Sequence, residues 1–228
     1  MKSIILAGTL VAVLVFAAFQ SAPAAKRDAP KVITIVALGD SLTEGYGLSR
    51  KQAYPALVAE KMRSAGYEFE VVNAGWSGDT TAGGLRRLPE ILRTRKKIDI
   101  LILALGINDA FRGVPIDQMR SNLQTIIDRT RARQPGVSII IAGMQLPLAS
   151  SDGYVRAFGE MFAALAEKND AALIPYLLEG VGGDPELNLP DRVHPNAAGQ
   201  RVLAQNVWRV LEPILQKTWA ATSPRGRD

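Results

Sequence analysis

The stretch Val32-Ile33-Thr34-Ile35-Val36-Ala37-Leu38 runs directly into Gly39-Asp40-Ser41. It is almost entirely apolar and does not alternate with polar residues, as expected of a strand buried on both faces of a parallel sheet. Further short apolar runs of this kind follow at residues 69–72, 98–105, 137–142 and 171–176. The chain therefore predicts five buried strands.

Longer amphipathic segments separate these runs. One carries an apolar stripe at helical spacing, made by Ile116, Met119, Leu123, Ile126 and Ile127. Strand–helix alternation of this kind predicts a three-layer α/β/α fold, with a parallel sheet covered by helices on both faces. Ligands in such folds bind beyond the carboxyl ends of the strands, so the segments that directly follow each strand are the candidate site.

Composition narrows the class of protein. The chain has 228 residues, of which 47% are hydrophobic and 21% charged, and this suits one large domain, placed here at 31–220. The net charge is +5, but the basic residues lie near predicted helix ends, where cations complement the helix dipole. Aromatic residues are few and not interleaved with these cations, so no nucleic-acid partner is expected.

The N-terminal residues read as an export signal. Lys2 precedes an uncharged apolar run at 4–19, and Ala22-Pro23-Ala24 offers a small-x-small cleavage site. We expect a signal peptide over 1–24 with cleavage near Ala24, a linker over 25–30, and a periplasmic or secreted protein without a stable membrane anchor. The alternative is an uncleaved N-terminal anchor. Residues 221–228 read as a flexible tail.

Two counts restrict the chemistry. There is no cysteine, which excludes thiol nucleophiles and thiolate metal sites, and His194 is the only histidine. We expect no metal and no cofactor. Histidine is the side chain whose unperturbed pKa lies close to neutral pH, so acid–base chemistry through an imidazole has one candidate. Asp191 stands three residues before it.

Polar residues follow the predicted strands. Gly39-Asp40-Ser41-Leu42 follows the first, and a segment that begins Asn73-Ala74-Gly75 and continues to Ser77-Gly78-Asp79-Thr80 follows the second. Gly106-Ile107-Asn108-Asp109 follows the third, and a long loop from Leu177 carries Asp191 and His194 to the last helix. Taken singly, each could be a turn or a helix cap.

Taken together, these blocks resemble the SGNH (GDSL) hydrolase superfamily over almost the whole mature chain. Gly39-Asp40-Ser41-Leu42 is similar to its nucleophile block, Gly75 to its second, Gly106-x-Asn108-Asp109 to its third and Asp191-x-x-His194 to its last. Within that superfamily, the sequence around these motifs is most similar to that of bacterial periplasmic arylesterases and of the multifunctional thioesterase and lysophospholipase subgroup. Arg192 departs from the pattern, since many relatives have glycine after the aspartate, and it places a charge beside the dyad.

The resemblance implies a flavodoxin-like strand order, 2-1-3-4-5, and a carboxylic ester hydrolase acting on a small acyl ester or thioester. It implies a catalytic triad of Ser41, His194 and Asp191. The implied oxyanion donors are the Ser41 and Gly75 backbone N–H groups and the Asn108 side chain. With neighbouring strands about 4.8 Å apart, the loops bearing these donors can converge.

Other residues near these blocks have expected roles as well. Asp40 and Asp109 are expected to accept hydrogen bonds from nearby turn N–H groups, and Ser77 is expected to be structural. Five loop side chains could line an acyl pocket, although core packing would suit each equally well: Phe111, Met144, Leu146, Tyr154 and Leu189.

Three alternatives deserve comparison. A receiver-like signalling module on the same sheet would use Asp40, but it needs a lysine after the fifth strand, where this chain has Leu177. A carbohydrate O-acetylesterase or an acyltransferase would use the same scaffold. A binding protein with a catalytically inactive site would lack one of the triad residues, and all three are present. Acyl length, leaving group, hydrolysis against acyl transfer, and oligomeric state stay open.

Overall fold

The computed structural model describes residues 32–146 and 153–220, so the expected signal peptide, linker and tail lie outside the described residues. Strands and helices alternate along the chain, as predicted. The strands are β1 (Ile33–Gly39), β2 (Phe69–Gly75), β3 (Ile100–Ala104), β4 (Ser138–Ala142) and β5 (Ala172–Ile174). The helices are α1 (Ser41–Glu44), η1 (Arg50–Gln52), α2 (Tyr54–Ser64), α3 (Thr81–Thr94), α4 (Ile107–Phe111), α5 (Ile116–Arg133), α6 (Gly153–Lys168) and α7 (Ala197–Ala220).

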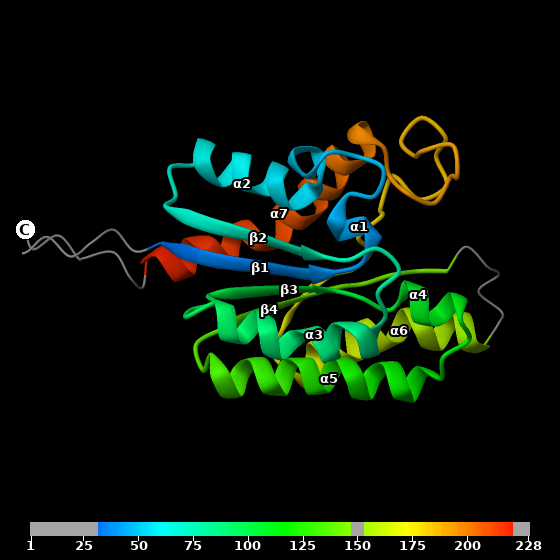
Figure 1. Cartoon of the computed structure of the whole chain (residues 1–228), viewed down its shortest axis with the longest axis horizontal. Helices are drawn as coiled ribbons and strands as arrows, with labels where there is room; N and C mark the ends of the chain where they lie inside the picture. The colour runs from blue at the N-terminus through cyan, green and yellow to red at the C-terminus, as the bar shows by residue number, and fades with distance from the viewer. Residues whose placement is uncertain (1–31, 147–152, 221–228) are drawn as a thin grey trace, which may run out of the picture.

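The five strands form one parallel sheet in the order β2-β1-β3-β4-β5, which confirms the order implied by the resemblance. Helices α2 and α7 cover one face of the sheet, and α3, α5 and α6 cover the other (Figure 1). The three-layer architecture is therefore confirmed. No helix within the described ranges is both long and apolar enough to cross a membrane.

Burial differs between the central and the edge strands. Every residue of β1 and β3 is buried, whereas most of β2 and two residues of β5 are only partly buried. The expectation of five strands buried on both faces is thus wrong for the two edges, because an edge strand has a neighbour on one side only. The core consists of the β1, β3 and β4 side chains with the apolar stripes of the helices.

The carboxyl ends of the strands position the site. Strand β1 ends at Gly39 and leads at once into the short helix α1, while β3 leads into α4. The segment after β5 returns over this edge of the sheet toward α1 before α7 begins (Figure 1). The side chain of Asn196 accepts hydrogen bonds from the N–H groups of Ala198 and Gly199, as expected of the cap of the last helix.

Candidate active site

Ser41 is the first residue of α1, directly beyond the end of β1. The Asp40 side chain caps this turn by accepting a hydrogen bond from Leu42 N–H at 3.0 Å, as expected of a local turn contact. Ser41 is 8% exposed, and its hydroxyl borders a cavity. The buried strand and the capped turn therefore hold one hydroxyl at the sheet edge where ligands bind in such folds.

The Ser41 hydroxyl meets the single imidazole. His194 Nε2 lies 3.0 Å from Ser41 Oγ, and His194 Nδ1 lies 2.8 Å from Asp191 Oδ2. A carboxylate at Nδ1 holds the proton on that nitrogen and leaves Nε2 to accept from the hydroxyl. The three side chains thus form a continuous chain from carboxylate to imidazole to hydroxyl, which can act as nucleophile, base and orienting group.

A tight turn holds Asp191 beside His194. Asp191 Oδ1 accepts hydrogen bonds at 2.9 Å from the backbone N–H groups of both Val193 and His194. These two donors, together with the imidazole, lower the pKa of Asp191 to about 2. The carboxylate is therefore charged at all pH values near neutral, ready to stabilise an imidazolium. On its other side the imidazole packs on the Tyr46 ring, with the centroids 4.4 Å apart.

Backbone and side-chain N–H groups face the same edge of the sheet. Ser41 N–H donates no hydrogen bond to any described residue. The Asn108 side-chain amide donates to the Asp79 carbonyl at 2.9 Å and reaches Asp40 Oδ2 only at a long 3.4 Å. One hydrogen of this amide is therefore held weakly. Both groups remain candidates to stabilise a developing oxyanion.

Gly75 does not fit its expected role as an oxyanion donor. Its single N–H donates to Asn73 Oδ1 at 2.9 Å, so it is already engaged. Gly75 is needed for another reason, since a Cβ there would lie 2.2 Å from the backbone nitrogen of Glu44 in α1. Three residues later, Gly78 N–H donates to no described residue. Gly78 is also next to Asp79, whose carbonyl accepts a hydrogen bond from the Asn108 side chain. Sequence reasoning missed Gly78.

A cavity of about 590 Å³ opens beside Ser41 and His194. Its walls are mainly apolar and come from loops after several strands. Among the described residues, the wall is formed by Leu42, Ile107, Asn108, Phe111, Gln145, Leu146, Tyr176, Leu178, Gly182, Gly183, Arg192 and Val193. A mostly apolar cavity with a few converging polar groups is the usual form of a small-molecule site.

Known proteins share this architecture. A sequence model of the GDSL-like Lipase/Acylhydrolase family matches residues 37–202. The chain is 37% identical to Esterase TesA of Pseudomonas aeruginosa, over 94% of this chain and 100% of that protein. It is 34% identical to Thioesterase 1/protease 1/lysophospholipase L1 of Escherichia coli, over 80% of this chain and 85% of that protein.

The chain belongs to the GDSL-like lipase/acylhydrolase family. The crystal structure of TesA superposes with a TM-score of 0.75 at 38% identity, covering 80% of this chain and 99% of the other. These matches confirm the resemblance to SGNH hydrolases, and they make the protein a carboxylic ester hydrolase. The receiver-like alternative is wrong.

The cavity of this hydrolase includes only part of the expected acyl-pocket lining. Phe111 and Leu146 line it, as predicted. Met144 is instead buried in the core, and the Tyr154 hydroxyl donates to the Val114 carbonyl. Leu189 contacts the turn at Gly47. These three are not among the described residues that line the cavity, because residues in the same loops can point to the core, to a neighbouring loop or to the cavity.

Sequence reasoning missed several residues that line the cavity. Ile107 and Leu42 stand next to motif residues and could have been found from that position. Leu178 and Gly182 belong to the turns after β5, where no hydrophobic periodicity marks which residues face inward. Proximity to a motif is therefore the more useful signal.

Three buried carboxylates support the strand-end loops of the hydrolase. Asp109 accepts from Thr81 N–H at 2.8 Å and from Thr81 Oγ1 at 2.6 Å. It therefore joins α4 to the start of α3, whereas a contact with a nearby turn N–H group had been expected. Asp79 pairs with Arg87 at 2.6 Å. Burial, helped by the charges of Asp79 and Asp109 and opposed by the Leu42 hydrogen bond, raises the pKa of Asp40 to about 7.

Ser77 has a structural contact, in agreement with its expected role. Its N–H donates to Glu44 Oε2 at 2.7 Å, and its hydroxyl donates to the same oxygen. The Ser77 hydroxyl is the main reason why the pKa of Glu44 is lowered. This contact links the loop after β2 to α1, the helix that begins with Ser41.

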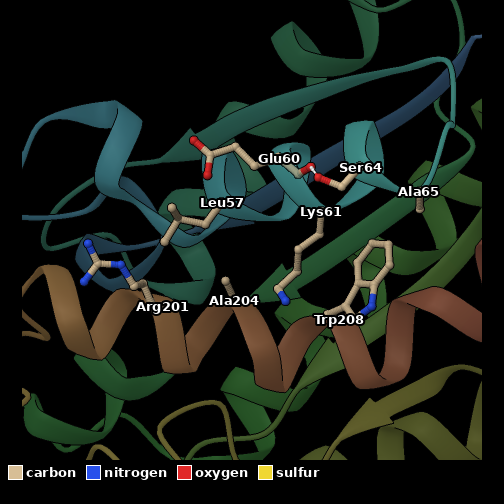
Figure 2. Close-up of a pocket in the computed structure, with 8 residues that line it drawn as sticks. All are labelled: Leu57, Glu60, Lys61, Ser64, Ala65, Arg201, Ala204 and Trp208. Carbon is tan, nitrogen blue, oxygen red and sulfur yellow. Dashed lines mark hydrogen bonds between the residues drawn. The ribbon is translucent and has the colours of Figure 1, made fainter.

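A second hollow, of about 640 Å³, lies between α2 and α7 and away from the triad. Lys61 extends from α2 toward α7, and the Trp208 ring rises from α7 beside it (Figure 2). The Lys61 ammonium donates to Gln205 Oε1 at 2.7 Å. None of the triad residues reaches this hollow. Residues 32–146 and 153–220 contain no group of three or more side chains suited to hold a metal ion.

Proposed function

We propose that this hydrolase cleaves its ester through Ser41, His194 and Asp191 by way of an acyl-enzyme. Ser41 Oγ forms a bond to the carbonyl carbon while its proton passes to His194 Nε2. The bond from that carbon to the leaving oxygen then breaks, and the leaving alcohol takes the proton from His194. Water repeats the sequence and releases the acid.

The oxyanion of each tetrahedral intermediate would be held by Ser41 N–H, the Asn108 side chain and Gly78 N–H. These donors either have no acceptor in the described structure or hold one weakly, in contrast to Gly75 N–H. Fixed donors that await the developing charge need no reorganisation during the reaction.

The main support is the hydrogen-bonded chain Asp191–His194–Ser41, with distances of 2.8 and 3.0 Å, at the edge of an apolar cavity. A cavity of about 590 Å³ suits a small acyl or aryl ester. We extend the substrates to thioesters because one relative is named a thioesterase.

A substrate panel with covalent labelling tests this proposal. We expect hydrolysis of p-nitrophenyl esters, with acyl-CoA and lysophospholipid assayed beside them. A fluorophosphonate should silence all activities together and add one adduct to Ser41, as read by peptide mass spectrometry. Ser77→Ala is the matched control, because the nearby serine is replaced and Ser41 should still be labelled. Label on another residue, or activity that survives complete labelling, contradicts the mechanism.

We also propose that the chain is exported and cleaved near Ala24, on the strength of Lys2, the apolar run at 4–19 and Ala22-Pro23-Ala24. Expression of the full chain in a Gram-negative host, followed by intact-mass measurement of the periplasmic fraction, should give a protein that begins near Ala25. An intact chain retained with the membranes would favour the uncleaved anchor.

A further inference from the structure

Arg192 stands out in backbone conformation. Its φ is +57°, in the left-handed region, which among the described non-glycine residues is shared only by Asp170. A side chain in this region costs about 1 kcal/mol relative to glycine. The turn needs this conformation, because it brings the N–H groups of Val193 and His194 to Asp191 Oδ1. The turn therefore explains the backbone but not the arginine, since glycine would adopt it without strain.

Arg192 also stands out in its surroundings. It lines the cavity beside Ser41 and His194, and no described residue of that cavity is an aspartate or glutamate. The neighbouring Asp191 carboxylate is already bound by two backbone N–H groups and the imidazole. Within the described ranges, no carboxylate forms an ion pair with Arg192. Arg192, which is exposed, is thus the one lysine or arginine among the described residues that line this mainly apolar cavity.

The position of Arg192 beside His194 indicates that it lies near the leaving group of the substrate. His194 Nε2 must lie next to the leaving oxygen, because it gives that oxygen a proton. Arg192 is two residues away on the same turn. Ile107, Phe111 and Leu146 line the cavity from the segments after β3 and β4 and offer the acyl group an apolar wall.

We propose that Arg192 is a specificity-determining residue that selects esters whose leaving group carries a carboxylate or a phosphate. This inference rests on the proposed function of Ser41 and His194. The planar guanidinium matches both anions with two parallel hydrogen bonds. The arginine is retained at a strained position because its charge binds the substrate.

A matched pair of chromogenic esters tests the proposal. 4-Nitrophenyl butanoate and 3-carboxy-4-nitrophenyl butanoate form the same acyl-enzyme and differ by one carboxylate on the leaving group. The ratio of their kcat/KM values therefore reports leaving-group recognition during acylation. We expect Arg192→Gln to lower the anionic-to-neutral ratio by about tenfold, the range of a hydrogen bond to a charged group.

Further variants separate charge from backbone strain. Arg192→Gly relieves the strain and removes the charge, and it should lower the ratio as much as Arg192→Gln does. Arg192→Lys keeps the charge and should retain part of the preference. Arg201→Gln is the control, because this exposed arginine lies on α7 at the hollow between α2 and α7 (Figure 2). It should leave the ratio unchanged.

Two results overturn the inference without touching the proposed function. If the ratio is the same in the wild type and in Arg192→Gln, even with both rates reduced, the arginine is merely structural. If Arg201→Gln lowers the ratio equally, the effect is one of overall charge. In both cases hydrolysis of the two esters by the wild type would leave the proposed function intact. If the wild type hydrolyses neither ester, the proposed function fails and this inference fails with it.

Discussion

His194 Nε2 lies 3.0 Å from Ser41 Oγ, although 153 positions of sequence separate the two residues. The contact exists because β1 ends between β2 and β3 at the carboxyl edge of the sheet, and the segment after β5 returns over this edge. His194 is the only imidazole in the chain, so no second imidazole can replace it.

Removal of the imidazole should abolish most of the hydrolysis. We expect His194→Ala and Ser41→Ala each to lower kcat by a factor on the order of 10³ or more, since both groups act in the same proton transfer. Stopped assays with p-nitrophenyl butanoate give kcat, and circular dichroism with thermal melting shows that the variants are folded. A folded Ser41→Ala protein with full activity would refute the triad.

Asp191→Asn tests the orienting carboxylate by itself. An asparagine Oδ1 can still accept from the Val193 and His194 N–H groups, so the turn should persist while the charge is lost. We expect kcat to fall by about a thousandfold, with the melting temperature nearly unchanged. Asp184→Asn is the matched control, because Asp184 Oδ1 likewise accepts a backbone N–H, from Glu186 in the same segment. Equal losses in both variants would argue against a role for Asp191.

Much of the fold follows from the sequence because buried parallel strands are continuous apolar runs. The strand positions could be predicted from residues such as Ile35, Leu103 and Ile140 alone. The order 2-1-3-4-5 could not, since the pairing of strands is non-local and came from the family resemblance. The partial exposure of β2 and β5 follows from that order, so it too was invisible in the apolar pattern.

The candidate site, like the fold, could be predicted from the sequence only in part. Ser41, Asp191 and His194 are motif residues, and the structure brings them together as expected. Gly75 ends β2 and Gly78 follows three residues later, and the sequence does not reveal that the Asn73 side chain already binds the Gly75 N–H. Which amide remains free depends on a side-chain contact that only the folded loop creates.

The Asn108 side chain should matter for rate more than for binding. Asn108→Ala removes a donor that acts on the charge developed in the transition state, so we expect kcat to fall about a hundredfold with little change in KM. Steady-state kinetics on one ester separate the two constants. A rise in KM at constant kcat would indicate ground-state binding instead and would remove Asn108 from the oxyanion site.

Gly75→Ala should damage the fold, because its Cβ would meet the backbone of Glu44 at 2.2 Å. Overpacking of this kind costs about 1–3 kcal/mol of the free energy of unfolding. Gly159→Ala is the contrasting variant: it lies within α6, and a Cβ there meets nothing within 4 Å. That change should stabilise the protein by up to about 1 kcal/mol. Urea titrations give both values, and similar effects of the two changes would contradict the close approach of Gly75 to α1.

The stability of the protein should fall between pH 4 and pH 8 on account of Asp40. Burial raises the pKa of Asp40 to about 7 in the folded protein, above its ordinary value of 3.8. The folded state therefore binds this proton more tightly than the unfolded chain does, and stability is lost as pH rises from about 4 through 7. Asp40→Asn keeps an acceptor for Leu42 N–H and removes the ionisation. The free energy of unfolding of the variant should therefore rise relative to that of the wild type by a few kcal/mol between pH 4 and pH 8. Urea titrations at pH 4.5 and pH 8 measure that difference, with Asp184→Asn as the exposed control. A difference that is constant with pH would show that Asp40 is already ionised in the fold at pH 4.5.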